Sequence, residues 1–347
     1  MKKIIKAVVA MVLISTVIFI MTGCGQSKPT LKVYNWGDYI DESIFKDFEE
    51  EYGIRIIYDT FATNEDMYIK IKAGGSDYDV AFPSDYMIER MISEDLLYEI
   101  NYNNIPNYKY IGDEFKNFSY DPTNGYSVPY MWGTVGIIYN TTMVDDTVDS
   151  WDILWNEKYA KQILMLDSQR DSIGITLKKL GYSLNTKNVD ELEAAKDALI
   201  EQKPLVLAYV GDEVKDKMIA GEAALAVVWS GDAVYMNWEN PDLEYAIPKE
   251  GSNLWFDAMV IPKTSKNKEN AELFINFMSR TDIAFKNADY IGYSTPHIEA
   301  RNLLDEDLIN DPTAYPELED LVNCEVFKDL SDFLREYDKI WTEVKAR

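Results

Sequence analysis

Residues 31–82 read LKVYNWGDYIDESIFKDFEEEYGIRIIYDTFATNEDMYIKIKAGGSDYDVAF. Three short apolar runs within them, at residues 31–34, 54–58 and 79–82, have the length and composition of β-strands. Each of the first two runs is followed by a segment with helical periodicity. The order strand, helix, strand, helix, strand predicts a mainly parallel sheet that helices cover on both faces.

The two segments between these runs carry helix signals. In the first segment, Asp41 is the expected N-cap and Gly53 the expected stop. Its apolar residues fall on one helical face, and they are Ile44, Phe45, Phe48 and Tyr52. The second helix is expected over residues 64–72 and closes at Gly74-Gly75. Helices with one apolar face pack on a sheet, which favours an α/β fold.

The same alternation continues through the rest of the chain. Further strands are expected at residues 205–210, 223–229 and 254–261, and helices at 212–220, 268–279 and 326–345. No internal repeat, low-complexity tract or Pro- and Gly-rich linker divides the sequence. A chain of 347 residues is long enough for two domains. We therefore expect two lobes between which the chain crosses more than once.

The charge balance excludes some classes of partner. The chain has 34 Lys and Arg residues against 60 Asp and Glu residues, so its formal net charge is −26. A general nucleic-acid binder needs a basic face for phosphate contacts, and this composition excludes one. The excess of carboxylates also disfavours an anionic substrate and favours a cationic ligand.

The first residues have the pattern of an export signal. Lys2, Lys3 and Lys6 form a basic start, and an apolar stretch follows over residues 7–21. A basic start, an apolar stretch and small residues at a cleavage point are typical of a secretory signal peptide. No later segment of the sequence is apolar over a length that would cross a bilayer.

The stretch ends in Met21-Thr22-Gly23-Cys24, which resembles a bacterial lipobox. In a lipobox the cysteine becomes lipid-modified and is the first residue of the mature protein. We therefore expect residues 1–23 to be a lipoprotein signal peptide, Cys24 to carry lipid and residues 24–30 to form a tether. An uncleaved N-terminal membrane anchor is the alternative.

The sequence contains two cysteines and one histidine. If Cys24 carries lipid, Cys324 has no disulfide partner and is expected to be a structural thiol. A nucleophilic Cys324 would need His297, the single imidazole, to activate it. His297 is instead expected to form local hydrogen bonds after Pro296.

Aromatic residues and carboxylates occur together where the predicted strands end. The fragments are Tyr34-Asn35-Trp36-Gly37-Asp38-Tyr39, Phe82-Pro83-Ser84-Asp85-Tyr86, Val228-Trp229-Ser230-Gly231-Asp232 and Trp255-Phe256-Asp257. In open α/β sheets ligands bind at the carboxyl ends of strands, so these fragments could converge. Aromatic faces attract ammonium groups, and carboxylates form charge-assisted hydrogen bonds with them. Together they favour a site for an organic amine.

Each fragment taken alone also suits a structural role. A Trp at a strand end often fills the core or an interface, and Asp38, Asp232 and Asp257 could each be helix caps or turn residues. The interpretation as a ligand site therefore depends on the joint order and spacing of the fragments.

That combination resembles the spermidine/putrescine-binding proteins of bacterial ABC importers, which have the type II periplasmic-binding-protein fold. The resemblance covers residues 31–345. The matching motifs are Tyr34-Asn35-Trp36, Thr63-Asn64-Glu65-Asp66-Met67-Tyr68, Tyr126-Ser127-Val128-Pro129-Tyr130-Met131-Trp132-Gly133, Lys179-Leu180-Gly181-Tyr182-Ser183, Pro248-Lys249-Glu250-Gly251 and Ile291-Gly292-Tyr293-Ser294-Thr295-Pro296.

The resemblance implies a set of ligand-binding residues. Those that would line the cleft are Trp36, Tyr39, Ser84, Tyr86, Trp229, Trp255 and Tyr293. Asp257 would hold one amine of the ligand, and Asp171 would hold the far amine. No metal, cofactor or catalytic residue is implied.

The resemblance leaves the choice of polyamine open. Asp38 and Asp232 match positions at which putrescine-preferring members carry acids. Ser168 stands where a spermidine binder can carry an Asp, and Phe327 stands where it has an amide side chain. The site therefore combines features of diamine and triamine binders.

The resemblance also implies two lobes that close around the ligand by a hinge motion. The N-terminal lobe would comprise residues 31–135 and 258–301, and the C-terminal lobe residues 136–257 and 302–347. The closed protein, expected to be a monomer, would dock on an ABC permease with an ATPase behind it. We expect it to be exported and lipid-anchored to the outer face of the bacterial cytoplasmic membrane, or periplasmic.

Three other functions compete with this interpretation. A solute-binding protein of the same fold could take another organic cation or small solute, such as thiamine. A glycoside hydrolase with paired carboxylates is disfavoured, because nothing in the sequence distinguishes one acid pair. The run of Asp145, Asp146, Asp149 and Asp152 lacks the register of a calcium loop and is expected to be a solvated turn.

Overall fold

The computed structural model describes residues 28–347, and the predicted signal peptide and Cys24 lie outside this range. Within it, nine strands form one sheet in the order β2-β1-β3-β9-β4-β7-β5-β6, with β8 paired to β4. The strands are β1 (Thr30–Trp36), β2 (Arg55–Phe61), β3 (Val80–Ala81), β4 (Ser127–Asn140), β5 (Ile163–Leu166), β6 (Val206–Val210), β7 (Leu225–Trp229), β8 (Leu243–Ala246) and β9 (Leu254–Val260).

Helices precede or follow most of these strands. They are α2 (Ser43–Tyr52), α3 (Asn64–Lys72), α4 (Asp85–Ser93), α5 (Gln169–Lys179), α6 (Val189–Gln202), α7 (Val214–Ile219), α8 (Ser230–Glu239), α9 (Lys268–Met278), α10 (Thr281–Ile291), α11 (Ile298–Arg301), α12 (Glu306–Ile309) and α13 (Leu334–Ala346). Short 3-10 helices lie at Tyr102–Asn104, Pro106–Tyr110, Asp113–Phe115, Trp151–Trp155, Glu157–Tyr159 and Ser331–Phe333.

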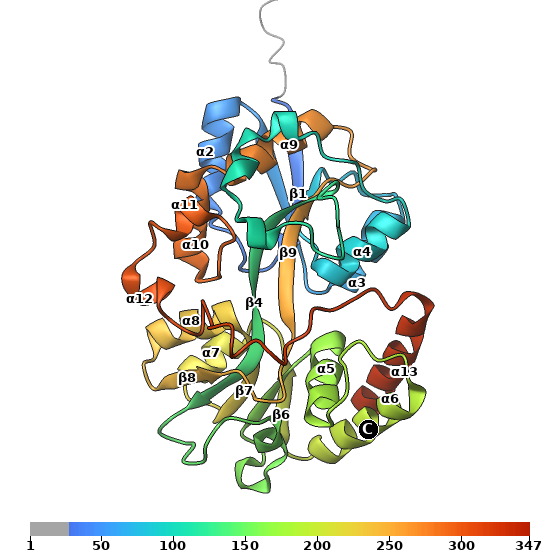
Figure 1. The fold of residues 1–347 in the computed structure, drawn as a ribbon, viewed down its shortest axis with the longest axis vertical. Helices are drawn as coiled ribbons and strands as arrows, with labels where there is room; N and C mark the ends of the chain where they lie inside the picture. Colours follow the sequence, from blue (N-terminus) through green and yellow to red (C-terminus); the bar gives the residue numbers. More distant parts are fainter. Residues whose placement is uncertain (1–27) are drawn as a thin grey trace, which may run out of the picture.

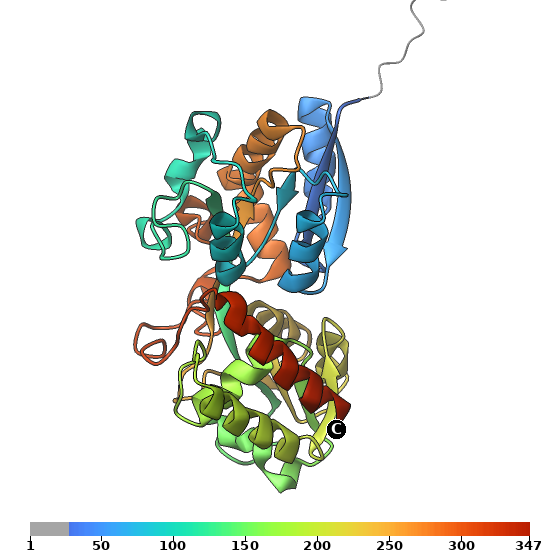
Figure 2. The same ribbon diagram turned by 90° about the vertical axis from the view of Figure 1, so that its right-hand side faces the viewer.

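The elements gather into two lobes (Figure 1). The upper lobe contains β1, β2 and β3 with α2, α3, α4, α9 and α10, and the lower lobe contains β5, β6 and β7 with α5, α6, α7, α8 and α13. Figure 2 shows the same division from the side, with α13 lying across the lower lobe. The α/β fold expected from the sequence is thus confirmed.

The strands within each lobe pair in parallel, whereas the strands that join the lobes pair antiparallel. Inside the lobes, β1 is parallel to β2 and β3, and β5 is parallel to β6 and β7. The long strands β4 and β9 are antiparallel to each other, and they pair antiparallel with β3 in one lobe and with β7 and β8 in the other. One continuous sheet therefore carries the chain from lobe to lobe.

A third segment crosses between the lobes after α12 (Figure 1). Its residue Glu325 receives a hydrogen bond from the backbone N–H of Leu254 at 3.0 Å and donates one from its own N–H to Ser252 at 2.9 Å. The crossing segment is thereby attached to the start of β9. The lobe boundaries at residues 135, 257 and 301 stay a prediction.

Local signals explain several helix ends. The side chain of Thr63 accepts a hydrogen bond from the N–H of Asp66 at 3.1 Å and so caps α3. Gly53 ends α2 with a φ of 69°, in the left-handed region that glycine enters without steric cost. Asp41 was expected to cap α2, but the N-cap is Glu42, and Asp41 accepts a hydrogen bond from Ser43 instead.

The C-terminal helix begins later than its periodicity predicts. α13 starts at Leu334, whereas the sequence suggested a helix from residue 326. The amide side chain of Asn185 holds the preceding backbone, because it donates to the carbonyl of Val326 and accepts from the N–H of Lys328, both at 2.9 Å. A tertiary contact thus overrides the helical pattern over these residues.

Candidate functional site

Asp257 lies on β9 between the two lobes, and its side chain is buried. Its carboxylate oxygen Oδ1 has no hydrogen-bond partner among the described residues. Burial raises the pKa of Asp257 to about 7, and the negative charge of Asp171 adds to the shift, while the hydroxyls of Ser84 and Tyr39 oppose it. An acceptor that is buried without a donor is costly, so this carboxylate is suited to receive a cation.

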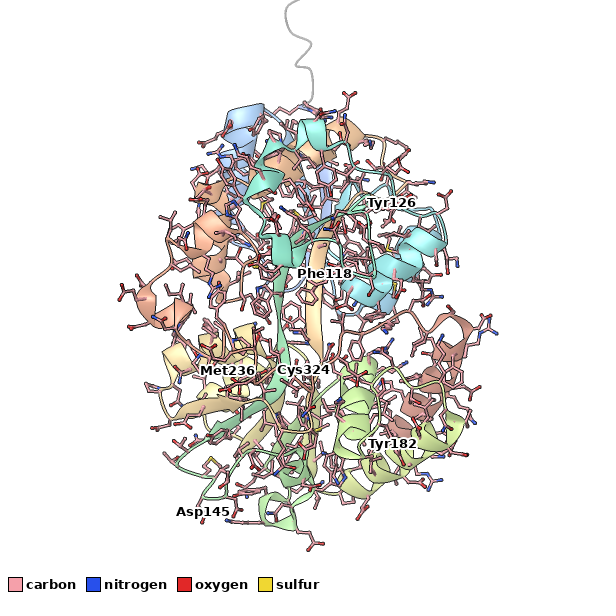
Figure 3. The ribbon with its side chains drawn as sticks, viewed as in Figure 1. Phe118, Tyr126, Asp145, Tyr182, Met236 and Cys324 are labelled. Atoms are coloured by element: carbon pink, nitrogen blue, oxygen red, sulfur yellow. The ribbon has the colours of Figure 1, made fainter. Side chains whose placement is uncertain are left out.

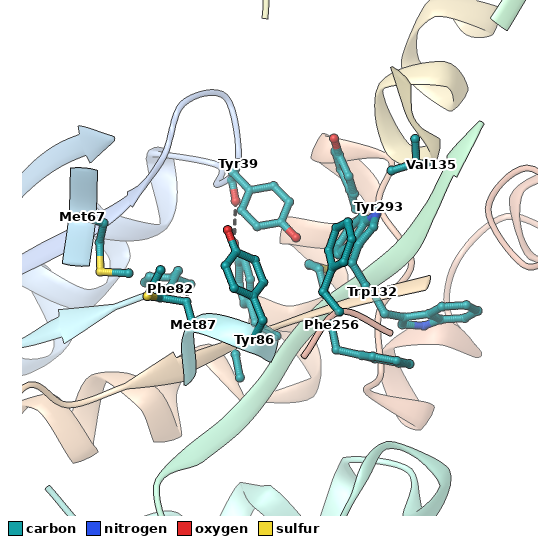
Figure 4. Packing of buried hydrophobic residues seen from close by; sticks show 14 of the residues in the cluster. Tyr39, Met67, Phe82, Tyr86, Met87, Trp132, Val135, Phe256 and Tyr293 are labelled. Atoms are coloured by element: carbon teal, nitrogen blue, oxygen red, sulfur yellow. Dashed lines mark hydrogen bonds between the residues drawn. The ribbon is translucent and has the colours of Figure 1, made fainter. Parts of the chain in front are cut away.

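Three aromatic residues that the sequence predicted for the site pack against one another. Tyr39 packs edge-to-face on Tyr293 with ring centroids 5.0 Å apart (Figure 4). The ring centroid of Trp255 lies 5.6 Å from that of Tyr293. The carbonyl oxygen of Tyr39 accepts a hydrogen bond from the hydroxyl of Tyr130 at 2.6 Å, which holds the loop after β1 in place. The Tyr39 hydroxyl and the Trp255 indole N–H have no partner among the described residues. These polar groups therefore remain available to a ligand.

The upper lobe contributes further predicted residues from strand ends. Trp36 ends β1, and its indole N–H donates to the carbonyl of Phe82 at 2.8 Å. Ser84 precedes α4, and its hydroxyl accepts a hydrogen bond from the Asn64 side chain at 3.1 Å. Because β1 and β3 are parallel, their carboxyl ends meet at one edge of the sheet, as the sequence argument expected.

Tyr86 lies in the first turn of α4 beside a residue that sequence reasoning missed. The Tyr86 hydroxyl donates to Glu65 at 3.0 Å. Its neighbour Asp85 is fully buried and accepts hydrogen bonds from the N–H groups of Tyr86 at 2.7 Å and Phe256 at 3.0 Å. Asp85 thereby ties α4 to β9, and burial raises its pKa well above the ordinary range.

The lower lobe contributes Asp171, Trp229 and Asp232. Asp171 lies in the first turn of α5, where it accepts hydrogen bonds from Ser168 at 2.7 Å and Asn253 at 3.3 Å. Trp229 ends β7, and Asp232 follows it in the first turn of α8. Burial raises the pKa of Asp171, and it raises that of Asp232 to about 6.

A lysine that was not predicted lies at the Asp232 end. The Lys215 ammonium is 3.0 Å from Asp38 of the upper lobe and 3.8 Å from Asp232 of the lower lobe. Of the eleven predicted residues, Asp38 alone is exposed, so it lies at the rim of the group. Lys215 is on α7, the helix that follows β6. If the residues after β6 had been considered together with those after the other strands, Lys215 would have been a candidate site residue.

Arg170 was also missed, and it lies at the Asp171 end. Its guanidinium is buried and lies over the rings of Phe327 and Tyr86, at 4.3 and 4.9 Å from their centroids. Phe327 packs edge-to-face on Tyr86 with ring centroids 5.9 Å apart. This cation–π stack joins the lower lobe to the upper lobe.

The remaining polar residues considered in the sequence analysis are His297 and the acidic run that begins at Asp145. Nδ1 of His297 accepts from the N–H of Ala300 and Nε2 faces the carbonyl of Ser279, both at 3.0 Å, so the imidazole is used locally as expected. Asp145 lies at the far end of the lower lobe (Figure 3), where it pairs with Lys158. In residues 28–347 no group of three or more His, Cys, Asp or Glu side chains could hold a metal ion.

The remaining observations concern Cys324 and the hydropathy of the helices. Cys324 is half-buried and forms no disulfide within residues 28–347. It lies between the lobes (Figure 3), and burial raises its pKa. Among the described residues no helix is long and apolar enough to cross a membrane.

Two lobes joined by crossing strands, with aromatic side chains and buried carboxylates between them, define the class of two-lobed solute-binding proteins. The profile of the family described as bacterial extracellular solute-binding protein matches residues 43–317. The chain belongs to this family, whose members bind solutes outside the cytoplasm and are not enzymes.

Individual relatives agree with this membership. The spermidine/putrescine-binding periplasmic protein of Salmonella typhimurium is 37% identical over 91% of this chain and 92% of its own length. Among solved structures, a spermidine/putrescine ABC transporter protein of Listeria monocytogenes is 47% identical, with a TM-score of 0.89 over 92% of this chain and 99% of that one. A spermidine/putrescine ABC transporter substrate-binding protein of Streptococcus pneumoniae is 45% identical, with a TM-score of 0.78 over the same shares.

Proposed function

We propose that this protein is the substrate-binding component of a polyamine ABC importer. It captures putrescine or spermidine between its lobes and delivers the amine to a membrane permease that a cytoplasmic ATPase drives. The names of the relatives favour a polyamine, and the buried carboxylate of Asp257 is the observation on which the proposal rests.

Asp257 can supply what an ammonium group requires. Its Oδ1 is buried and has no donor among the described residues. The rings of Tyr39 and Trp255, which are also predicted site residues, both pack against Tyr293. A ligand ammonium would donate hydrogen bonds to the carboxylate and contact the aromatic faces, which contribute about 0.5–2 kcal/mol each. The burial cost of Asp257 would then be offset by the ligand charge.

The second half of the site would hold the rest of the ligand. Asp171 is buried on the lower lobe, and the Oδ1 of its neighbour Asn253 has no donor among the described residues. A ligand that spans Asp257 and Asp171 would contact both lobes. Ligand binding would therefore favour the closed arrangement, which the permease would recognise.

We further propose that Cys24 carries lipid and anchors the protein to the outer face of the cytoplasmic membrane. The basic start, the apolar stretch and the Gly23-Cys24 pair support this. Residues 24–30 would then form a short tether between the lipid and β1. The mature protein would act as a monomer.

The proposal is tested by a thermal-shift panel followed by calorimetry at pH 8. The panel contains putrescine, cadaverine, spermidine, spermine, thiamine, maltose and ferric citrate. We expect stabilisation by at least one polyamine and a loss of affinity of at least tenfold in Asp257→Asn, because a hydrogen bond to a charged group contributes about 1.5–3 kcal/mol.

Asp289→Asn is the matched control, because Asp289 lies on α10 of the upper lobe and is exposed. We expect it to bind polyamines as the wild type does. Stabilisation by thiamine, a sugar or iron without any polyamine would overturn the proposal, and unchanged affinity in Asp257→Asn would remove that residue from the site.

A further inference from the structure

Lys215 is a cation inside the predicted cation-binding site. It lies on α7, and 13% of its side chain is exposed. Asp38 of the upper lobe is 3.0 Å from its ammonium, and Asp232 of the lower lobe is 3.8 Å away. The charges of Asp232, Asp38 and Asp212 raise the pKa of Lys215 against the lowering effect of burial, so the side chain is charged at neutral pH.

The two lobes touch beside this cluster. A Cβ atom placed on Gly37, next to Asp38, would lie 2.6 Å from the Oδ2 of Asp212. The upper and lower lobes are therefore in contact here, and the lysine fills the space between their carboxylates. An ammonium of a ligand would need the same oxygens that Lys215 contacts.

The two other carboxylates of the site are in the opposite situation. Neither Asp257 nor Asp171 forms an ion pair within 4.0 Å with a lysine or arginine of residues 28–347. The Oδ1 atoms of Asp257 and of Asn253, which contacts Asp171, are buried and have no donor in that part of the chain. Both oxygens of Asp171 accept hydrogen bonds, from Ser168 and from Asn253, so among the described site carboxylates Asp257 is the one with an unsatisfied oxygen.

We propose that the Lys215 ammonium takes the place of a ligand ammonium at the Asp38–Asp232 end, so that the protein prefers a diamine to a longer polyamine. The inference rests on the proposed polyamine binding. Asp257 and Asp171, which form no ion pair with a lysine or arginine of residues 28–347, match two ammonium groups. A third ammonium would lie beside Lys215 or without a carboxylate, and juxtaposed like charges are costly. Lys215 is in this sense a specificity-determining residue.

The test compares the affinities of putrescine and spermidine by calorimetry at pH 8 and constant ionic strength. The variant Lys215→Met removes the charge and keeps an unbranched side chain. We expect the ratio of the spermidine Kd to the putrescine Kd to fall at least tenfold, because Asp38 and Asp232 become available to the third ammonium. Lys215→Arg keeps the charge, and we expect it to retain the wild-type ratio.

Lys217→Met is the matched control on the same helix, because Lys217 pairs with Glu222 at the surface and 34% of its side chain is exposed. We expect its ratio to equal that of the wild type. The inference is wrong if Lys215→Met keeps the wild-type ratio, if Lys217→Met changes it equally, or if Lys215→Arg behaves like Lys215→Met.

The wild-type protein gives a measurement that does not depend on the folding of a variant. We expect it to bind putrescine at least as tightly as spermidine, and a preference for spermidine of tenfold or more would overturn the inference. Such a result would leave the proposed function standing. A wild-type protein that binds no polyamine would instead contradict the proposed function itself.

Discussion

At the scale of single residues, Asp257 is a carboxylate that folding places where water cannot solvate its charge. Burial raises its pKa from 3.8 to about 7. Between these two values the folded protein holds a proton that the unfolded chain has lost. Stability falls with rising pH wherever the folded state binds more protons than the unfolded state. Asp257 therefore destabilises the ligand-free protein increasingly from about pH 4 to pH 7, and above pH 7 the destabilisation stays constant.

We therefore expect Asp257→Asn to stabilise the ligand-free protein in a pH-dependent way. The asparagine is neutral at every pH, so its advantage in the free energy of unfolding should grow by about 3 kcal/mol between pH 5 and pH 8. Urea unfolding at both pH values measures it. Asp289→Asn, at an exposed position, is the control, and its free energy of unfolding should differ from that of the wild type by the same amount at both pH values. A pH-independent effect of Asp257→Asn would contradict the expectation.

At the scale of elements, the contact between α8 and the segment after α10 joins the two lobes. The ring of Tyr293 lies directly on Gly231, because a Cβ atom placed there would be 2.2 Å from the ring. Asp232, the next residue of α8, interacts with the hydroxyl of Tyr293. A residue without a side chain is therefore needed at the start of α8 for the lobes to meet.

From this contact we expect Gly231→Ala to weaken polyamine binding by at least tenfold, as calorimetry would show. The methyl group displaces Tyr293, which the proposed mechanism needs against the ligand. The midpoint of thermal unfolding without ligand should change little, because the contact joins lobes that the proposed hinge separates. Gly75→Ala is the control, since a Cβ atom there meets no atom within 4 Å. Wild-type affinity in Gly231→Ala would refute this role.

The elements themselves were largely predictable from sequence periodicity. The helix over residues 64–72 was predicted with its observed bounds, and the strands β1, β6, β7 and β9 were placed within two residues of their ends. The start of α13 was not predictable, because it depends on hydrogen bonds from Asn185, which is distant in sequence. Periodicity contains no information about such a partner.

At the scale of the whole molecule, two lobes share one sheet through β4 and β9 (Figure 1). This connection brings the ends of β1 and β3 of the upper lobe near the ends of β5 and β7 of the lower lobe, although these strands are far apart in sequence. The predicted site residues meet there because of the crossing topology. Their exact ligand contacts remain part of the proposal.

The proposed lipid anchor also belongs to this scale, because it sets where the whole protein acts. After digestion of the cell wall, we expect the wild-type protein to stay in the membrane fraction and a Cys24→Ala variant to be released. Fractionation followed by immunoblotting measures this, with the polyamine affinity of the released variant as a check on its folding. Release of the wild type, or retention of the variant, would contradict lipidation at Cys24.

The sequence by itself determined the α/β class and the family, because strand and helix periods and strand-end motifs are local, and it predicted the aromatic and acidic residues of the candidate site. Only the tertiary structure decided that Lys215 meets Asp38 and Asp232 and that Arg170 stacks on Phe327 and Tyr86. It also decided that Oδ1 of Asp257 has no donor within residues 28–347. The physical reason is that charge compensation depends on distances between residues of different lobes, and a local pattern does not contain those distances.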